Sequence, residues 1–418
     1  MAKTEYLLGI DIGSSNVRAI MVQSSLEDDL LRVMGAVTLP AEGMRRGVVV
    51  SPELIAKVCM KAVEHAERMA GSPSKNVTIG LSGTDVFCQN ALGVVAVARA
   101  DSEVTEEDVA RAIGEVEARV MLPANREILH VIPKNYRLDD QNDIKDPVGM
   151  RGVRLEADAF VIGTSTAQMK GISRIFEAAG IVPGAYAVEP IAAAEAILNP
   201  KQKEIGVVLI NIGGSTTSMA VFEEGELVHL SILPVGGISI TNDIAIGLRV
   251  SVETAEAVKM SYGHALSREI GKKEDIDLGS IDSHEEGFVS RHHVAEIIEA
   301  RMEEIFNLVN GELKKVHREG LLPAGAVLCG GGSLLAGTGD LAKEILRLPV
   351  QIGYPKPLGG ILDQVDSPEY ATAIGLVLLA QERRRTGIGG TAESKMPDWA
   401  KQTGSKVRDW VRRFLPLD

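Results

Sequence analysis

The sequence predicts an α/β fold built from two copies of one domain, with two accessory subdomains added to them. Residues 7–22, LLGIDIGSSNVRAIMV, and residues 207–222, VVLINIGGSTTSMAVF, share one pattern: an apolar run, a short turn with glycine, and a second apolar run. The two segments align without a gap, with Asp11 on Asn211 and Gly13 on Gly213. Each run has the composition of a buried strand, so each copy should begin with a β-hairpin.

Both turns have the composition of a phosphate-binding loop. A tight turn between strands directs successive backbone N–H groups outward, and only Gly or Ser side chains let an anion approach them closely. Two such turns facing each other could hold a polyphosphate from both sides. The predicted phosphate-binding residues are Gly13, Ser14 and Ser15 in the first turn and Gly213, Gly214, Ser215 and Thr216 in the second.

A third glycine-rich segment follows in AVLCGGGSLLAG, residues 326–337. It reads as a buried strand that runs into Gly330, Gly331, Gly332 and Ser333 and then into an apolar, helix-like stretch. Such a corner allows flat contact with a base or a ribose. A lone glycine turn most often only turns the chain, but three of them in this order are stronger support for a binding site.

The three loops in this order resemble the actin/Hsp70/sugar-kinase ATPase superfamily. VEPIAAAEAIL, with Glu189 and Pro190, resembles the helix that connects the two halves, and YATAIGLVLLA (370–380) resembles the second connecting helix. Within the superfamily the chain resembles the FtsA family of bacterial cell-division proteins, through HVIPKNYRLDDQNDIKDPVGMRGVRLEADAFVIGTS, VGGISITNDIAIGL and AEAVKMSYGHAL.

This resemblance extends from Tyr6 to about Ala380 and implies both ligands and partners. The implied ligands are ATP and Mg²⁺. The implied partners are further copies of the chain in a head-to-tail filament, the C-terminal peptide of the tubulin-like protein FtsZ, the membrane lipid surface and other division proteins. The implied location is the cytoplasmic face of the cell membrane at the division septum.

The resemblance also assigns roles to individual residues. Asp11 would hold Mg²⁺ through water, Arg18 would contact the β-phosphate, and Glu189 would orient the attacking water. Gly237 would belong to the nucleotide site. Glu256 and Lys259 would contact ribose and adenine, and their spacing of three residues places them on one helix face.

One departure from the superfamily pattern concerns hydrolysis. The second loop usually reads Asp-Ile-Gly-Gly-Gly-Thr, whereas here Asn211 takes the place of the aspartate. An uncharged amide is a poorer magnesium ligand and cannot act as a base. Loss of one charged transition-state contact typically costs about 2–4 kcal/mol, so we expect binding to survive and turnover to be slow or absent.

The duplicated pattern divides the chain into segments. The first core lobe is predicted at 1–83, 160–201 and 370–385, and the second at 202–237 and 324–369. An inserted α+β subdomain is predicted at 84–159, a helical accessory subdomain at 238–323, a flexible linker at 386–404 and an amphipathic helix at 405–418.

The insert should contain a strand at 93–100, a helix carrying the apolar stripe from Val109 to Val120, and strands at 127–138 and 152–163 around the polar turn 139–143. Because it has no glycine-phosphate loop, it is interpreted as a contact between subunits. The alternative is a structural lid.

The accessory subdomain should contain a long helix with Val294, Ile298, Ile305, Val309 and Val316 on one stripe. By the same resemblance it would receive the acidic, apolar FtsZ peptide, for which Arg291 and Arg301 are the candidate basic residues. The alternative is that these charges are only a solvated helix face.

The tail is a candidate membrane anchor. Residues 386–404 are glycine-rich and polar, and SKVRDWVRRFLPLD follows at 405–418. Trp and Phe beside Arg is the composition of a helix that lies in the lipid headgroup layer. The alternative is docking on the protein's own body. The predicted membrane-binding residues are Val407, Arg408, Trp410, Val411, Arg412, Arg413, Phe414 and Leu415.

Composition limits the other possibilities. The chain has 418 residues, no apolar run reaches the roughly 18–20 residues of a membrane span, and no signal segment precedes the first strand, so a cytoplasmic protein of more than one domain is expected. A net charge of −13 argues against nucleic acid as a partner. Two related functions stay open, a scaffold of type IV pilus assembly and a small-molecule kinase. The kinase would leave the basic, tryptophan-bearing tail without a purpose.

Overall fold

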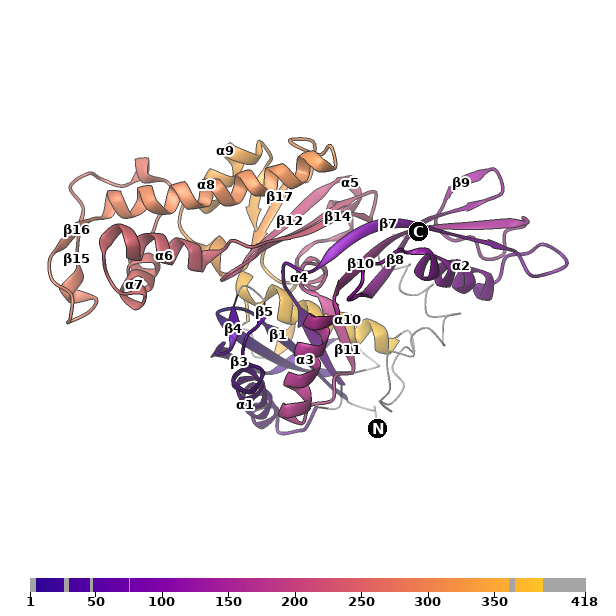
Figure 1. Cartoon of the computed structure of the whole chain (residues 1–418), viewed down its shortest axis with the longest axis horizontal. Coiled ribbons are helices and arrows are strands. Elements are labelled where there is room, and N and C mark those ends of the chain that lie inside the picture. Colours follow the sequence, from indigo (N-terminus) through magenta and orange to yellow (C-terminus); the bar gives the residue numbers. More distant parts are fainter. Residues whose placement is uncertain (1–4, 26–29, 46–47, 75, 361–364, 386–418) are drawn as a thin grey trace.

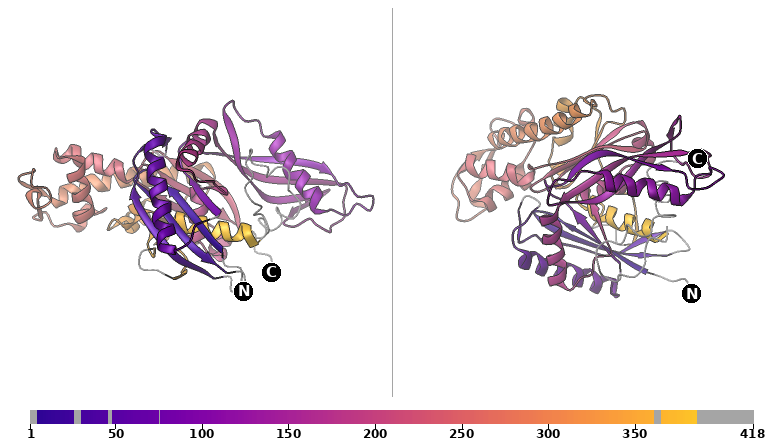
Figure 2. Two further views of the ribbon diagram at one scale, coloured as in Figure 1. Left: turned by 90° about the horizontal axis from the view of Figure 1, so that it is seen from below. Right: turned by 45° about the vertical axis from the view of Figure 1, so that its right-hand side comes forward.

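The structure, a computed structural model, describes residues 5–25, 30–45, 48–74, 76–360 and 365–385. Two α/β lobes lie at its centre, and an accessory subdomain extends from them on either side (Figure 1; Figure 2). The predictions of a linker at 386–404 and an amphipathic helix at 405–418 fall outside the described residues. No helix in the described part of the chain is long and apolar enough to cross a membrane.

The first lobe is built on a six-stranded sheet in the order β11-β6-β1-β2-β3-β19. Helices α1 and α3 cover one face of it, and α10 packs on the other. The elements are β1 (Glu5–Ile12), β2 (Asn16–Ser24), β3 (Leu31–Pro40), β4 (Met44–Arg45), β5 (Val48–Val49), α1 (Pro52–Ala70), β6 (Asn76–Leu81), α3 (Thr166–Ala179), β11 (Ala185–Val188), β19 (Gly359–Gly360), η4 (Pro368–Tyr370) and α10 (Ala371–Arg385).

The second lobe repeats this plan with a five-stranded sheet in the order β14-β13-β12-β17-β18. As in the first lobe, three antiparallel strands are followed by two parallel strands on the other side of the first one. Its elements are α4 (Glu189–Ile197), α5 (Pro200–Ile205), β12 (Val207–Ile212), β13 (Thr217–Glu223), β14 (Glu226–Leu233), β17 (Ala326–Cys329), η3 (Gly331–Leu334), α9 (Thr338–Leu346) and β18 (Val350–Ile352). The predicted duplication is confirmed.

The two hairpins are equivalent to the residue. In β1 and β2, Asp11 is opposite Arg18, and in β12 and β13, Asn211 is opposite Ser218. Each turn is closed by the same backbone hydrogen bond, from Gly13 N–H to the Asn16 carbonyl (3.0 Å) and from Gly213 N–H to the Thr216 carbonyl (2.9 Å).

The two connecting helices lie between the sheets and pack against each other. Helix α4 lies against β12 and β13, while α10 lies against β1, β2 and β6. At their crossing, a Cβ added to Gly375 would overlap the backbone carbonyl of Ala192. Glycine therefore lets the helix backbones touch, which joins the two lobes.

The insert forms a four-stranded sheet in the order β7-β10-β8-β9, covered by α2. Thr105 and Asp108 form a capping box at the start of α2. Three details differ from the prediction: the first strand lies at Phe87–Ala96 rather than 93–100, a short strand occupies part of the expected turn, and α2 ends just before Val120. The elements are β7 (Phe87–Ala96), α2 (Glu106–Arg119), β8 (Arg126–Leu138), β9 (Gln141–Ile144) and β10 (Arg154–Ser165).

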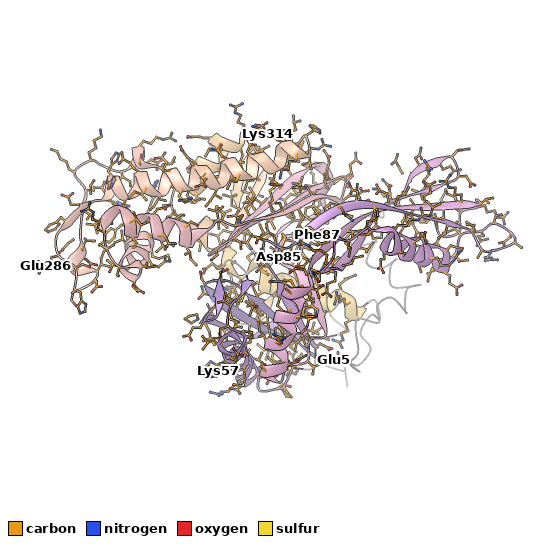
Figure 3. All side chains as sticks on the ribbon, in the orientation of Figure 1. Glu5, Lys57, Asp85, Phe87, Glu286 and Lys314 are labelled. Atoms are coloured by element: carbon orange, nitrogen blue, oxygen red, sulfur yellow. The ribbon has the colours of Figure 1, made fainter. Side chains whose placement is uncertain are left out.

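Polar contacts fix the base of the insert. The Ser165 hydroxyl donates to the Asp85 carboxylate at 2.7 Å, and the Arg126 guanidinium lies 5.2 Å from the centre of the Phe87 ring. Asp85 and Phe87 lie together near the middle of the molecule in Figure 3.

The accessory subdomain is mainly helical, as predicted. Val294, Ile298, Ile305 and Val309 are buried along one face of α8, but Val316 lies just beyond the helix end. The elements are α6 (Gly237–Leu248), α7 (Val252–Tyr262), η1 (Ser267–Glu269), β15 (Asp275–Asp277), η2 (Leu278–Ser280), β16 (Phe288–Ser290) and α8 (Arg291–Lys315).

Replacing Gly375 by alanine should destabilise the protein, because the new Cβ would push α4 and α10 apart. Overpacking of this kind typically costs about 1–3 kcal/mol. Gly311→Ala in α8 is the matched control, because a Cβ there has nothing within 4 Å and should raise helix stability by up to about 1 kcal/mol. Urea unfolding of both variants measures the difference, and equal stabilities would contradict the crossing described here.

Candidate functional site

The turns of the two hairpins meet where the lobes join. A Cβ added to Gly214 in the second turn would overlap the Ser15 hydroxyl in the first. Gly13 and Gly213 are also confined, since a Cβ on either would lie within about 3 Å of a carbonyl oxygen of its own turn. The structure therefore brings the two predicted anion-binding turns face to face, with small residues at the contact.

Helix α6 begins directly against the second turn. The N–H groups of Gly237 and Ile238 donate to the carbonyls of Gly213 and Gly214, at 2.9 and 2.7 Å. A Cβ on Gly236 would collide with the same carbonyls. The positive end of the α6 dipole thus lies at this turn, which favours negative charge beside it.

Lys259 adds a cation at the same end of α6. Its Nζ donates to the Gly237 carbonyl (3.2 Å), the Thr241 hydroxyl (2.8 Å) and the Glu256 carboxylate (2.7 Å). The expectation that Glu256 and Lys259 share one face of a helix is confirmed. Lys259 contacts Gly237, and Glu256 contacts Lys259 and Thr241.

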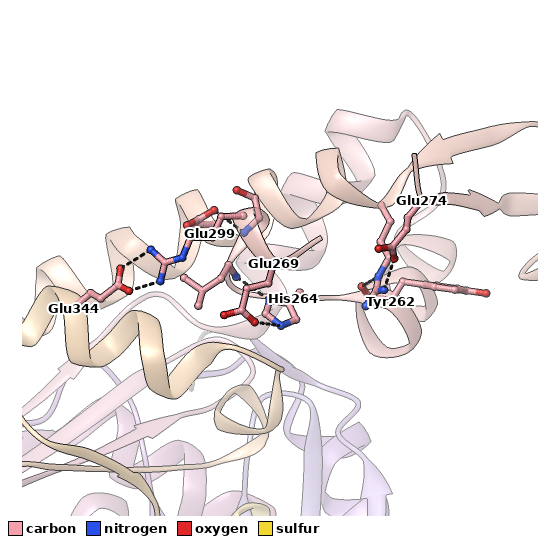
Figure 4. Close-up of polar contacts among 10 residues, drawn as sticks. Tyr262, His264, Glu269, Glu274, Glu299 and Glu344 are labelled. Carbon is pink, nitrogen blue, oxygen red and sulfur yellow. Dashed lines mark hydrogen bonds and ion pairs between the residues drawn. The ribbon is translucent and has the colours of Figure 1, made fainter. Parts of the chain in front are cut away.

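The chain beyond α7 is held in place by polar contacts with α8 and α9. Ser267 N–H donates to the Glu299 carboxylate (2.9 Å), and Arg268 forms an ion pair with Glu344 (Figure 4). Within the segment, His264 Nε2 lies 3.4 Å from Glu269 Oε2. These contacts hold the segment that follows α7 against α8 and α9, outside the proposed nucleotide site.

The third loop reaches the second hairpin. Gly330 has φ +78°, and a Cβ there would overlap the Asn211 side chain, so both backbone geometry and space require glycine. The Ser333 hydroxyl donates back to the Gly330 carbonyl at 2.7 Å and is buried. The 3-10 turn η3 covers Gly331–Leu334, so the stretch expected to be helix-like directly after Ser333 is mostly non-helical, and α9 begins only at Thr338. Gly337, in the left-handed region, separates the two.

Asp11 and Arg18 lie opposite each other on the first hairpin. Burial raises the pKa of the Asp11 carboxyl to about 6, although Arg18 lowers it in part. The Arg18 Nε is buried without a hydrogen-bond partner among the described residues. A carboxylate that lacks solvation and a cation with an unused donor fit a site for a metal ion and an anion.

Glu189, the first residue of α4, lies between the lobes. It accepts hydrogen bonds from the Ser218 hydroxyl (2.9 Å) and the Asn211 amide. Its pKa is raised to about 7, mainly by burial; the two hydrogen bonds lower the pKa in part, and Asp11 contributes to raising it. A carboxyl poised near neutrality suits proton transfer. Asn211 holds this carboxyl, and aspartate at position 211 would set two carboxyl groups against each other.

The sequence prediction missed the segment just before α10. The Glu369 carboxylate accepts a hydrogen bond from Arg18 Nη2 at 2.9 Å. The Tyr370 hydroxyl is 2.8 Å from the Thr38 hydroxyl, and the Pro368 carbonyl accepts from Gly330 N–H at 3.1 Å. Nothing in the local pattern SPEY marks these residues, because their partners come from β2, β3 and the third loop.

The two arginines proposed for peptide binding are engaged within the accessory subdomain. Arg291 pairs with Glu274 (2.7 Å) and donates to the Tyr262 carbonyl (3.0 Å). Arg301 makes two hydrogen bonds to Asp243, at 2.6 and 3.0 Å, and also contacts Glu304. A peptide carboxylate that binds either arginine would have to share that arginine with these acidic side chains.

Comparison with known proteins identifies the family. A model described as "Cell division protein FtsA" matches residues 208–375, and one described as "SHS2 domain inserted in FTSA" matches residues 83–163, which spans most of the insert. The cell division protein FtsA of Pseudomonas aeruginosa is 35% identical over 382 residues, 91% of both chains. That of Bacillus subtilis is 36% identical over 402 residues, 96% of this chain and 89% of the relative. The chain belongs to the FtsA family.

Solved structures agree on the fold. The type IV pilus biogenesis complex PilM–PilN has a chain with a TM-score of 0.65 at 18% identity, covering 90% of this chain and 98% of that one. MreB5 of Spiroplasma citri bound to ADP gives 0.53 at 14% identity, covering 92% and 99%. These likenesses show the fold alone and confirm the predicted actin-like architecture, which implies a nucleotide site.

An Asp11→Asn variant should become more stable than the unliganded wild type as the pH rises. Well below pH 3.8 the wild-type carboxyl is protonated in both the folded and the unfolded state, so the two proteins should be about equally stable. Above about pH 6 the wild type must bury a charge, because its folded pKa is raised from 3.8 to about 6. The difference should grow to the order of 2–3 kcal/mol.

Urea unfolding across this pH range provides the measurement. Asp140→Asn, in an exposed turn of the insert, is the matched control and should show no growing difference. A difference between Asp11→Asn and wild type that stays constant with pH would contradict the buried charge.

Proposed function

We propose that this chain binds ATP with Mg²⁺ between its two lobes and acts in cell division as an actin-like filament protein. The observation that carries the proposal is the contact between the two glycine turns, with Gly214 against Ser15. Two opposed sets of backbone N–H groups suit a polyphosphate better than a single phosphate.

The surrounding residues then take the roles implied by the family. Ser14, Ser15, Ser215 and Thr216 offer hydroxyl and N–H groups to phosphate oxygens, and Asp11 orders water on the metal. The third loop and the pair Glu256 and Lys259 hold the ribose and adenine. Bound Mg²⁺ supplies positive charge to the phosphates.

Turnover is proposed to be slow. Glu189 is the residue that could accept a proton from water, and its pKa of about 7 leaves it only partly ionised at neutral pH. Asn211 donates a hydrogen bond to Glu189, but its uncharged amide is a poorer magnesium ligand than a carboxylate. The nucleotide would therefore act mainly to set the conformation and assembly of the chain.

The wider function follows from the family name. In this proposal the chain assembles head to tail and receives the FtsZ C-terminal peptide on the accessory subdomain. It also recruits other division proteins and attaches to the cytoplasmic face of the membrane at the septum through residues 405–418. A subunit contact made by the insert fits this assembly, because the insert projects away from the lobes (Figure 1).

The two related functions have less support. The likeness to the PilM–PilN complex is one of fold, whereas the relatives that are 35–36% identical over nearly the whole chain are cell division proteins. A small-molecule kinase would share the fold but would give the predicted amphipathic tail no role.

Mg·ATP binding by calorimetry tests the nucleotide site. Asp11→Asn and Lys259→Ala should each weaken binding by roughly 10- to 100-fold, as expected when a charged hydrogen bond is lost. Arg268→Ala, whose partner Glu344 lies on α9, is a control for the loss of a cation and should leave affinity unchanged. No binding by the wild type, or equal binding by all four proteins, would refute the proposal.

Liposome flotation tests the membrane anchor. Burial of large apolar side chains is worth about 1.5–3 kcal/mol each, less the cost of ordering the helix, so one tail should bind weakly. A filament with many tails could raise retention by roughly 10² to 10⁴. Trp410→Glu should abolish flotation, and Trp399→Glu, in the predicted linker, should not. Equal flotation of wild type and Trp410→Glu would rule out this anchor.

A further inference from the structure

The ion pair between Arg18 and Glu369 joins residues that are 351 positions apart, and it lies at the proposed phosphate site. Arg18 belongs to the first hairpin, and its side chain is only 12% exposed. Glu369 belongs to η4, at the entrance to α10. The pair is therefore well shielded on the arginine side, where an ionic interaction is screened less than on an open surface.

The carboxylate lies over the third loop as well. A Cβ on Gly331 would be 3.0 Å from Glu369 Oε1, the same oxygen that accepts from Arg18. This oxygen therefore faces both the arginine and the loop proposed for adenosine. The Tyr370 ring, 5.7 Å from the guanidinium, closes another side of Arg18. A ligand that bridges the first turn and the third loop would have to pass close to Glu369.

The guanidinium has binding capacity left. Its Nη2 donates to Glu369, and its Nε is buried without a hydrogen-bond partner among the described residues. The Glu369 side chain is 36% exposed, against 12% for Arg18, and it lies in a single 3-10 turn. It can therefore turn outward more easily than the Arg18 side chain can. A stronger anion could therefore take its place.

We propose that Glu369 competes with the nucleotide's phosphates for Arg18, and so sets how strongly the site prefers a triphosphate. This inference rests on the proposed nucleotide site. Phosphate approaching Arg18 meets a neighbouring carboxylate of the same sign, and like charges at close range cost binding energy. The penalty grows with the charge of the ligand, so it is largest for ATP, smaller for ADP and absent for adenosine.

The competition has a structural consequence. While Glu369 holds Arg18, the segment before α10 is tied to the first lobe, and the Pro368 carbonyl ties the same segment to Gly330 of the second lobe. Release of Glu369 by phosphate removes one of these ties. The ligand thereby changes the connection between the lobes through an internal carboxylate.

Calorimetry with ATP, ADP and adenosine on the full chain tests the competition. Glu369→Gln keeps a hydrogen-bond acceptor but removes the charge, so it should bind ATP roughly 5- to 20-fold more tightly, ADP by a smaller factor and adenosine unchanged. Glu344→Gln is the matched control, since Glu344 is an exposed carboxylate on α9 that is likewise paired with an arginine, Arg268. It should leave all three affinities unchanged.

A double-mutant cycle assigns the effect to Arg18. In an Arg18→Gln background, Glu369→Gln should give little or no gain in ATP affinity, because the competed cation is gone. ATP affinity of Glu369→Gln within twofold of wild type, or an equal gain for adenosine, would overturn the inference while leaving the proposed function intact. Failure of the wild type to bind any nucleotide would overturn both.

Discussion

The crossing of α4 and α10 is the contact on which the geometry of the site depends. Gly375 allows the α10 backbone to touch the carbonyl of Ala192 on α4. Each helix begins at the site: α4 starts with Glu189, and α10 follows directly after Glu369 and Tyr370. One close approach therefore fixes two carboxylates, one from each connecting segment, relative to both hairpins. A larger residue at the crossing would displace all of these groups together.

Duplication explains why so much of the fold could be predicted from the sequence. The hairpins repeat with the same apolar runs and the same turn, and their observed registers agree residue for residue. The pair Glu256 and Lys259 could be placed on one helix face because helical spacing is a local property. The site residues contributed by these elements follow from short-range patterns.

The remaining features depend on contacts that no local pattern encodes. Gly359 and Gly360 return from the second-lobe segment to pair with β3 of the first lobe, which extends that sheet. The stretch after Ser333 is apolar enough for a helix, yet Gly337 interrupts it at a left-handed backbone angle that glycine adopts readily. The position of Glu369 at the site could not be predicted, because it depends on a contact with Arg18 from the other end of the chain.

The charges around the first turn conflict unless a metal ion accompanies the anion. The turns attract negative charge through backbone N–H groups, and the α6 N-terminus does so through its helix dipole. Asp11, Glu189 and Glu369 repel it from the same region, and Arg18 is the cation facing both Asp11 and Glu369. A divalent cation near Asp11 would remove part of this repulsion and lower the cost of ionising the buried carboxyls. The pKa values of Asp11 and Glu189 are raised mainly because both carboxyls are buried, and Asp11 adds to the shift of Glu189. A bound Mg²⁺ would favour the charged forms of the same groups, so the cost of burying them and the expected requirement for Mg²⁺ are linked.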